Sequence, residues 1–248
     1  ASDVYKRQVL KSTRGNIYDR NGEMVASNIL SYSLTFEDNG SYETTREKNL
    51  TLNGVAYRVL QILSENGDSL SGDFHIVLDE NGNYAFDVGE GFTLSRFKAD
   101  IYGHPLIDDL TKEQASATAG DMMNYLTGSD GFSIVLYGED AYAPEELEQY
   151  GLPKELSKQE ILDIASMRYK LNTNSFQKYM AVTIATNVSE STVAAVMENQ
   201  SQLQGIDVIE DSVRQYIDDE SMGPVLGYTG RASAEEPVSY THLTLPTT

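Results

Sequence analysis

Two short strings in this chain place a lysine three residues after a serine: Ser95-Arg96-Phe97-Lys98 and Ser175-Phe176-Gln177-Lys178. When such a serine opens a helix, one turn brings both side chains into one cleft, where the amine can activate the hydroxyl as a nucleophile. Ser64-Glu65-Asn66 matches the Ser-x-Asn string of such sites, but there is no Lys-Thr-Gly string. About one serine–lysine string is expected by chance at this composition. We therefore predict no catalytic residue in this chain.

The remaining reactive side chains do not form a recognisable site. His75 falls in an alternating segment and His104 in a Gly-His-Pro loop, and neither has the partner spacing of a zinc site. The absence of cysteine excludes disulfides, thiolate metal sites and a cysteine nucleophile. Paired acids are interpreted as solvated faces or helix-start charges, although the sequence alone leaves a glycosidase pair open; they are Asp108-Asp109, Glu145-Glu146 and Asp218-Asp219. We expect no metal and no cofactor.

One acidic segment has two interpretations, a calcium loop and a β-hairpin. Asp79, Asn81, Asn83, Asp87 and Glu90 occupy ligand positions of an EF-hand loop. However, Tyr84 stands where that loop needs glycine for its sharp turn, and no helices flank the segment. We therefore predict a hairpin with strands at residues 74–78 and 84–88.

A second turn lies near the N-terminus, where residues 9–28 are expected to be extended. Asn21-Gly22 is the dipeptide that tolerates positive φ at both central positions of a tight turn. Arg14, Asp19 and Arg20 crowd around it, which suggests at least one held ion pair. On physical grounds alone, a charged hairpin tip in solvent is the simpler interpretation.

The rest of the chain mixes strands and helices without βαβ regularity, so we predict an α+β fold. Alternation predicts a half-buried strand at residues 31–36, and helical spacing predicts a helix over 44–66 with one face on a sheet. Capping signals and apolar patterns predict helices at residues 94–102, 111–126, 143–150, 157–171, 190–198 and 222–228. Further strands are expected at residues 132–137, 180–185 and 206–210.

Charge excludes some partners. The formal net charge is −20. Such an acidic chain repels phosphates and anionic lipid, so we expect no nucleic acid and no peripheral membrane binding. No apolar run approaches the roughly 20 residues of a membrane span.

Both termini are expected to be artefacts. Residues 1–8 can be encoded by a transposase sequencing adapter, and residues 238–248 by the reverse complement of the same DNA. We therefore expect a gene fragment running from about residue 9 to residue 237. Without Asp3, Lys6 and Arg7, it keeps 37 acids and 16 bases, a net charge of −21.

Three ordered motifs resemble one known family. The segment Arg14-Gly-Asn-Ile-Tyr-Asp-Arg-Asn-Gly-Glu-Met-Val-Ala-Ser-Asn28 resembles the opening motif of the N-terminal dimerisation, or pedestal, domain of class B penicillin-binding proteins. Arg214-Gln-Tyr216, followed by Gly223-Pro-Val-Leu-Gly-Tyr-Thr-Gly230, resembles its closing motif, and residues 182–209 fit between them in order. Ile217 replaces the usual proline and Gly223-Pro224 the usual Ala-His pair, which puts the local turn geometry in question.

The resemblance implies a scaffold rather than an enzyme. The parent would be a membrane-anchored peptidoglycan D,D-transpeptidase that binds β-lactams, and this fragment its extracytoplasmic, non-catalytic module without the anchor helix. Its partners would be the parent's own transpeptidase domain and a SEDS-type glycosyltransferase among other cell-wall synthesis proteins. A free-standing extracellular binding domain unrelated to cell-wall synthesis is the alternative.

The resemblance also suggests a division of the chain. Residues 9–36 and 178–237 would build the pedestal sheet, and residues 37–177 the inserted helical head. Arg14, Asp19, Arg20 and Arg214 would form a buried or half-buried charge network at the pedestal base. Gly15, Gly22 and Gly227 would serve backbone geometry. Tyr216 and Gly230 complete the set of structural motif residues.

Overall fold

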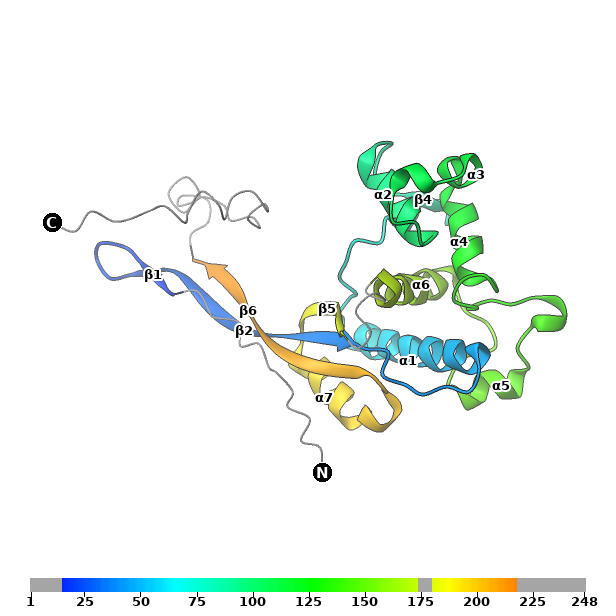
Figure 1. The fold of residues 1–248 in the computed structure, drawn as a ribbon. Helices are drawn as coiled ribbons and strands as arrows, with labels where there is room; N and C mark the ends of the chain where they lie inside the picture. The colour runs from blue at the N-terminus through cyan, green and yellow to red at the C-terminus, as the bar shows by residue number, and fades with distance from the viewer. Residues whose placement is uncertain (1–14, 174–179, 218–248) are drawn as a thin grey trace, which may run out of the picture. The chain divides into compact units, whose positions relative to one another are not determined.

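A computed structural model describes residues 15–173 and 180–217 (Figure 1). The chain divides into two units, one formed by residues 1–29 with 213–248 and the other by residues 30–212. The predicted helix at 222–228 and both expected adapter segments lie outside the described residues. The fold mixes helices with a sheet, which confirms the predicted α+β class.

Four strands form the main sheet. They are β1 (Ile17–Tyr18), β2 (Met24–Phe36), β5 (Val182–Val188) and β6 (Ile206–Tyr216). β2 pairs antiparallel with β1 through Ile17 and Ala26, and antiparallel with β5 through Leu34 and Ala185. β6 also pairs with β2. The long β2 therefore organises the sheet.

The predicted strand at 31–36 is the second half of β2, but it is not half-buried. Both Ser33 and Leu34 are buried, although neighbouring residues point to opposite faces of a sheet. The Thr35 hydroxyl donates to the Asp207 carbonyl at 3.4 Å and the Ser31 hydroxyl to Asn187 at 3.1 Å. The polar residues that suggested a solvent face are instead covered and hydrogen-bonded.

The predicted helix at 44–66 is α1 (Thr45–Glu65). Thr44 caps it, because its hydroxyl accepts a hydrogen bond from the Glu47 amide. It packs against α6 (Lys158–Thr173) and α7 (Glu190–Glu198), and its buried Val59 and Leu63 belong to the same core cluster as Leu34 and Phe36 of β2. Gly54 is needed at a close approach, since a Cβ there would lie 2.1 Å from the Tyr150 carbonyl oxygen.

The single helix predicted at 111–126 is two helices, α3 (Lys112–Ser116) and α4 (Ala119–Thr127). The break comes at Thr118, whose hydroxyl accepts from the Asp121 amide while the Asp121 carboxylate accepts from the Thr118 amide. This reciprocal cap starts a new helix and ends the old one. The predicted helix at 94–102 is α2 (Phe92–Ile101), followed by a 3₁₀ turn, η1 (Ile107–Asp109).

Residues 132–137 do not form the predicted strand. The amides of Phe132 and Ile134 donate to the carbonyls of Leu126 and Thr127, so this segment closes the C-terminal end of α4. Ser133 has a positive φ of 49°, which a regular strand does not allow. Phe132 and Ile134 are buried in this loop, whereas Tyr137 is 82% exposed.

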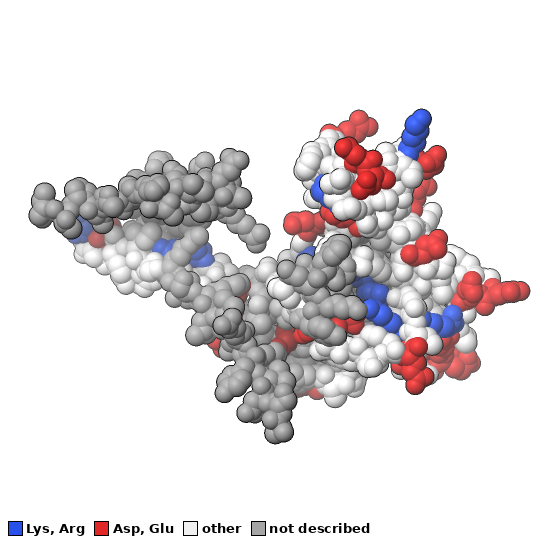
Figure 2. All heavy atoms as spheres, in the orientation of Figure 1, with Lys and Arg blue, Asp and Glu red and all other residues white. Residues whose placement is uncertain are grey.

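The predicted hairpin is present with shorter strands, whereas the 3₁₀ turns η2 (Gly138–Asp140) and η4 (Gln200–Gln202) were not predicted. The hairpin consists of β3 (Ile76–Leu78) and β4 (Tyr84–Phe86). These two 3₁₀ turns and helix α5 (Pro144–Gln149) complete the set. A capping box formed by Ser157 and Glu160 starts α6, the helix that capping signals predicted at residues 157–171. Figure 2 shows acidic side chains spread over α2 to α5 with few basic ones between them.

Candidate functional site

The N-terminal motif forms a tight hairpin tip between β1 and β2. The Asp19 carboxylate accepts hydrogen bonds from the amides of Asn21 and Glu23, at 2.8 and 2.7 Å. The Asp19 amide donates to the Glu23 carbonyl, and Gly22 has a φ of +84°. Asn21 has no positive φ, so the expected geometry is wrong in this detail. The turn matches a three-residue loop with one left-handed glycine.

Arg214 of β6 contacts the N-terminal motif within the smaller unit. Its Nη1 donates to the Gly15 carbonyl at 2.7 Å and to the Asn28 Oδ1 at 3.2 Å. Nearby, the Ile217 amide donates to the Val25 carbonyl. Segments 199 residues apart in the sequence therefore meet through one half-buried arginine.

The other predicted motif residues are placed as follows. Arg20 is exposed and Tyr216 is 41% exposed. Among the described residues, no ion pair joins Asp19 to Arg20 or Arg214. Arg14, Gly227 and Gly230 lie outside the described residues, so a charge network through Arg14 remains a prediction.

The serine–lysine strings have different positions. Ser95 and Lys98 both lie on α2, whereas Ser175 and Lys178 lie outside the described residues. The Ser-x-Asn string lies at the end of α1. Ser64 and Glu65 are its last residues, and the Asn66 side-chain amide donates to the Ile62 carbonyl as part of the helix cap. No hydrogen bond joins Ser95 to Lys98 in the described part of the chain.

His75, His104 and the calcium-like loop have structural partners. His75 Nδ1 lies 3.0 Å from Asp87 Oδ1, and His104 Nε2 lies 2.8 Å from Gln114 Oε1. Asp79 is the acceptor at the tip of the β3–β4 hairpin, where it binds the amides of Asn81 and Asn83. Within residues 15–173 and 180–217, no group of His, Asp and Glu has the arrangement of a metal site.

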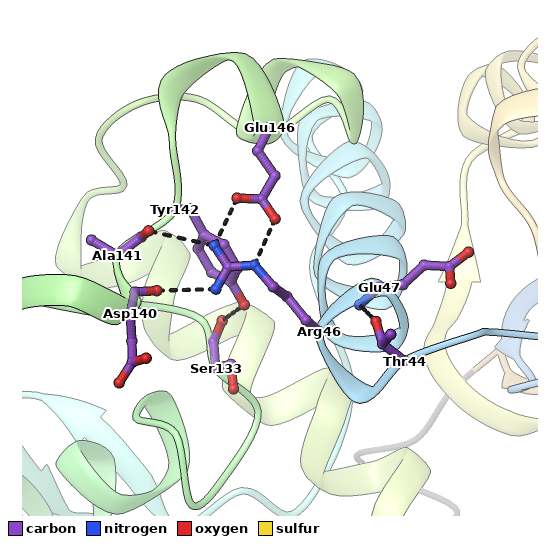
Figure 3. A network of polar contacts seen from close by, with 8 residues as sticks. All are labelled: Thr44, Arg46, Glu47, Ser133, Asp140, Ala141, Tyr142 and Glu146. Atoms are coloured by element: carbon purple, nitrogen blue, oxygen red, sulfur yellow. Dashed lines mark hydrogen bonds and ion pairs between the residues drawn. The ribbon is translucent and has the colours of Figure 1, made fainter.

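Sequence reasoning missed two polar networks around the loop 132–142. In the first (Figure 3), the Arg46 guanidinium of α1 binds both carboxylate oxygens of Glu146, at 2.6 and 2.7 Å. It also donates to the Asp140 carbonyl and lies 4.4 Å from the Tyr142 ring centroid. The Tyr142 hydroxyl donates to the Ser133 carbonyl at 2.8 Å. The hydrogen bond from Arg46 holds the pKa of Glu146 below its usual value.

The second network is buried and centres on Arg168 of α6, which is 5% exposed. Its guanidinium donates to the side-chain oxygens of Asn53 and Asn49 of α1, at 2.5 and 2.8 Å. The Asn53 amide group donates onward to the Phe132 carbonyl, and that of Asn49 to the Ser133 hydroxyl. Burial lowers the pKa of Arg168 to about 10. Two asparagines four residues apart on a buried helix face were the available signal.

The polar contacts of the hairpin tip, Arg214 and the two networks have a structural role. A hairpin tip held by its own amides, an arginine that joins two distant segments, and two networks that fix a loop all stabilise geometry. Neither network contains a hydrogen-bonded nucleophile and base.

Comparison with known proteins identifies the family. Residues 9–244 match the profile of the penicillin-binding protein dimerisation domain. The chain belongs to this family. No curated protein matches it. The hairpin tip and Arg214 therefore lie within a penicillin-binding protein dimerisation domain.

Two solved structures are similar to this chain. Penicillin-binding protein 2B from Streptococcus pneumoniae strain 5204 is 16% identical with a TM-score of 0.44, covering 94% of this chain and 30% of its own. The same protein from strain R6 is 18% identical with a TM-score of 0.35, covering 88% and 27%. Because these scores are low, the family assignment rests on the profile match. The chain spans less than a third of either protein's length.

In the part of the chain that the structure describes, no helix is long and apolar enough to cross a bilayer.

Proposed function

We propose that this chain is the non-catalytic N-terminal scaffold of a membrane-anchored class B penicillin-binding protein. It positions a serine transpeptidase domain on the extracytoplasmic face of the membrane and contacts cell-wall synthesis proteins, chiefly a SEDS-type glycosyltransferase. The pedestal would comprise residues 9–36 and 178–237, and the head residues 37–177. Family membership favours this scaffold over a free-standing binding domain unrelated to the cell wall.

The observation that carries the proposal is the contact of Arg214 with Gly15 and Asn28. This contact joins the opening motif of the family to its closing motif within one unit. A scaffold domain needs such a contact, because its first and last segments must fold together. Arg20 lies five residues from Gly15, is exposed, and has no hydrogen bond or ion pair with another described residue. A long cation at a fixed hairpin tip suits an acidic group on a neighbouring domain.

Labelling with fluorescent penicillin tests the non-catalytic assignment. The β-lactam acylates an activated serine, so the 248-residue chain should remain unlabelled while a longer protein that includes the following domain is labelled. Label on the 248-residue chain would contradict a non-catalytic scaffold. A longer protein without label would contradict the active transpeptidase parent.

Charge reversal tests the positioning role. Arg20→Glu should leave the thermal midpoint of the 248-residue chain unchanged, because Arg20 has no hydrogen bond or ion pair with another described residue, and lower the midpoint of the longer protein. Lys112→Glu, at an exposed position of α3, is the matched control and should change neither. Equal effects of Arg20→Glu in both proteins, or none in the longer one, would contradict domain docking at this tip.

A further inference from the structure

A cavity of about 860 Å³ lies in the larger unit, away from the family motifs. Its walls come from β4, α2, η1 and the junction of α3 and α4. Apolar wall residues include Phe86, Leu94 and Leu110. This volume falls within the range of small-molecule sites, which combine apolar walls with a few fixed polar groups.

One of those polar groups is the amine of Lys98. The residue is 8% exposed, and its Nζ donates to the Ala115 carbonyl at 2.7 Å and lies 5.3 Å from the Phe86 ring centroid. An ammonium has three N–H donors, and this hydrogen bond uses one of them. Burial lowers the pKa of Lys98, which the charge of Glu90 partly offsets. A buried cation with unused donors favours an anionic partner.

Ser95 supplies a second donor beside Lys98. It lies one turn earlier on α2, lines the same cavity, and its hydroxyl makes no hydrogen bond to the described residues. The spacing of three residues puts both side chains on one face of the helix. The string Ser95-Arg96-Phe97-Lys98, to which we assign no catalytic role, therefore places two hydrogen-bond donors in the cavity wall.

The charges around the cavity restrict the ligand. Glu90 and Asp108 also line it, so a dianion such as phosphate would meet two carboxylates for one ammonium. A carboxylate carries a single charge and accepts hydrogen bonds at both oxygens. We propose that this cavity binds small apolar molecules that carry one carboxylate, with Lys98 and Ser95 donating to that carboxylate and the apolar walls covering the rest.

Calorimetric titration of the 248-residue chain with 3-phenylpropionate and with 3-phenylpropionamide tests this site. The two probes share their apolar body and differ in the charged oxygen, so the carboxylate should bind at least tenfold more tightly. Equal affinities would overturn the assigned recognition, and so would binding of neither probe. Inorganic phosphate should bind more weakly than 3-phenylpropionate, and the reverse order would also overturn it.

Two variants locate the binding. Ser95→Ala should weaken 3-phenylpropionate by a few-fold and Lys98→Met by tenfold or more, while both leave the amide unchanged. Lys112→Met removes an exposed ammonium outside the cavity and should change neither probe. If Lys98→Met fails to fold, Ser95→Ala and the two probes on the unaltered chain still decide the outcome. If both Ser95→Ala and Lys98→Met bind 3-phenylpropionate with unchanged affinity, its carboxylate binds elsewhere and the proposal is overturned.

Discussion

Two arginines hold the same loop of the larger unit in opposite environments. Arg46 reaches residues 140–146 from α1 with a side chain that is 42% exposed, and a carboxylate, Glu146, binds it directly. Arg168 reaches residues 132 and 133 from α6 through two asparagines, fully enclosed and with no carboxylate in its hydrogen-bonding shell. Solvent screens the ion pair of Arg46 with Glu146. Water cannot reach the buried Arg168 network to replace a lost hydrogen bond.

The difference between the two arginines indicates which contacts contribute most to the stability of the loop. An exposed ion pair typically contributes about 0.2–1 kcal/mol. A buried donor that serves two buried acceptors is costly to remove, because each acceptor left unsatisfied costs about 1–3 kcal/mol. Arg168 should therefore determine whether the loop docks, and Arg46 should only tighten it.

The largest effect is expected for Arg168→Met. This change preserves the aliphatic volume but leaves the side-chain oxygens of Asn49 and Asn53 without their donor, so the free energy of unfolding should fall by about 3 kcal/mol. Urea denaturation at low and high salt measures it, and the loss should be the same at both. A loss below about 1 kcal/mol would contradict the central role of the buried network.

A smaller effect is expected for Tyr142→Phe. The ring stays between the two networks while the hydrogen bond to the Ser133 carbonyl disappears. The Asn53 amide group still donates to that carbonyl at 3.3 Å, so the loss should be about 1 kcal/mol. Thermal denaturation measures it. Tyr137→Phe, on a residue that is 82% exposed, is the control and should have no effect.

The smallest effect is expected for Arg46→Ala, about 0.5 kcal/mol at neutral pH and less at high salt. The pKa of Glu146 is below its usual 4.5 in the folded chain, because Arg46 binds the carboxylate. This contribution is present above pH 4.5 and disappears as the pH falls through the lowered value. Thermal midpoints of Arg46→Ala and the unaltered chain should thus converge in acid. A constant difference would show that packing on Tyr142, and not charge, stabilises this contact.

Local signals explain most of what the sequence predicted. Caps such as Ser157 with Glu160 and Ser189 before α7 fixed helix starts, because a cap satisfies amides within a few residues. The same signal at Thr118 and Asp121 was present, but the surrounding apolar pattern suggested one continuous helix. Residues 132–137 look like a strand in composition, and only the carbonyls of α4 turn them into a loop.

Long-range relations were beyond such patterns. Arginine and asparagine are ordinarily surface residues, so composition gave no reason to bury Arg168 with Asn49 and Asn53. The family motifs drew attention to Arg214, while its acceptors, the Gly15 carbonyl and the Asn28 side chain, depend on the pairing of distant strands. The cavity beside Lys98 likewise requires five separate elements to meet.

The pairing of β2 with β6 has a consequence for synthesis. Asp207 of β6 follows Thr35 of β2 by 172 residues. At a ribosomal rate of about 5–20 residues per second, Asp207 is synthesised roughly 10–35 seconds after Thr35. During that interval its open backbone edge can pair with another chain. The nascent protein is therefore most vulnerable to aggregation before β6 emerges, and holding chaperones should bind it in that window.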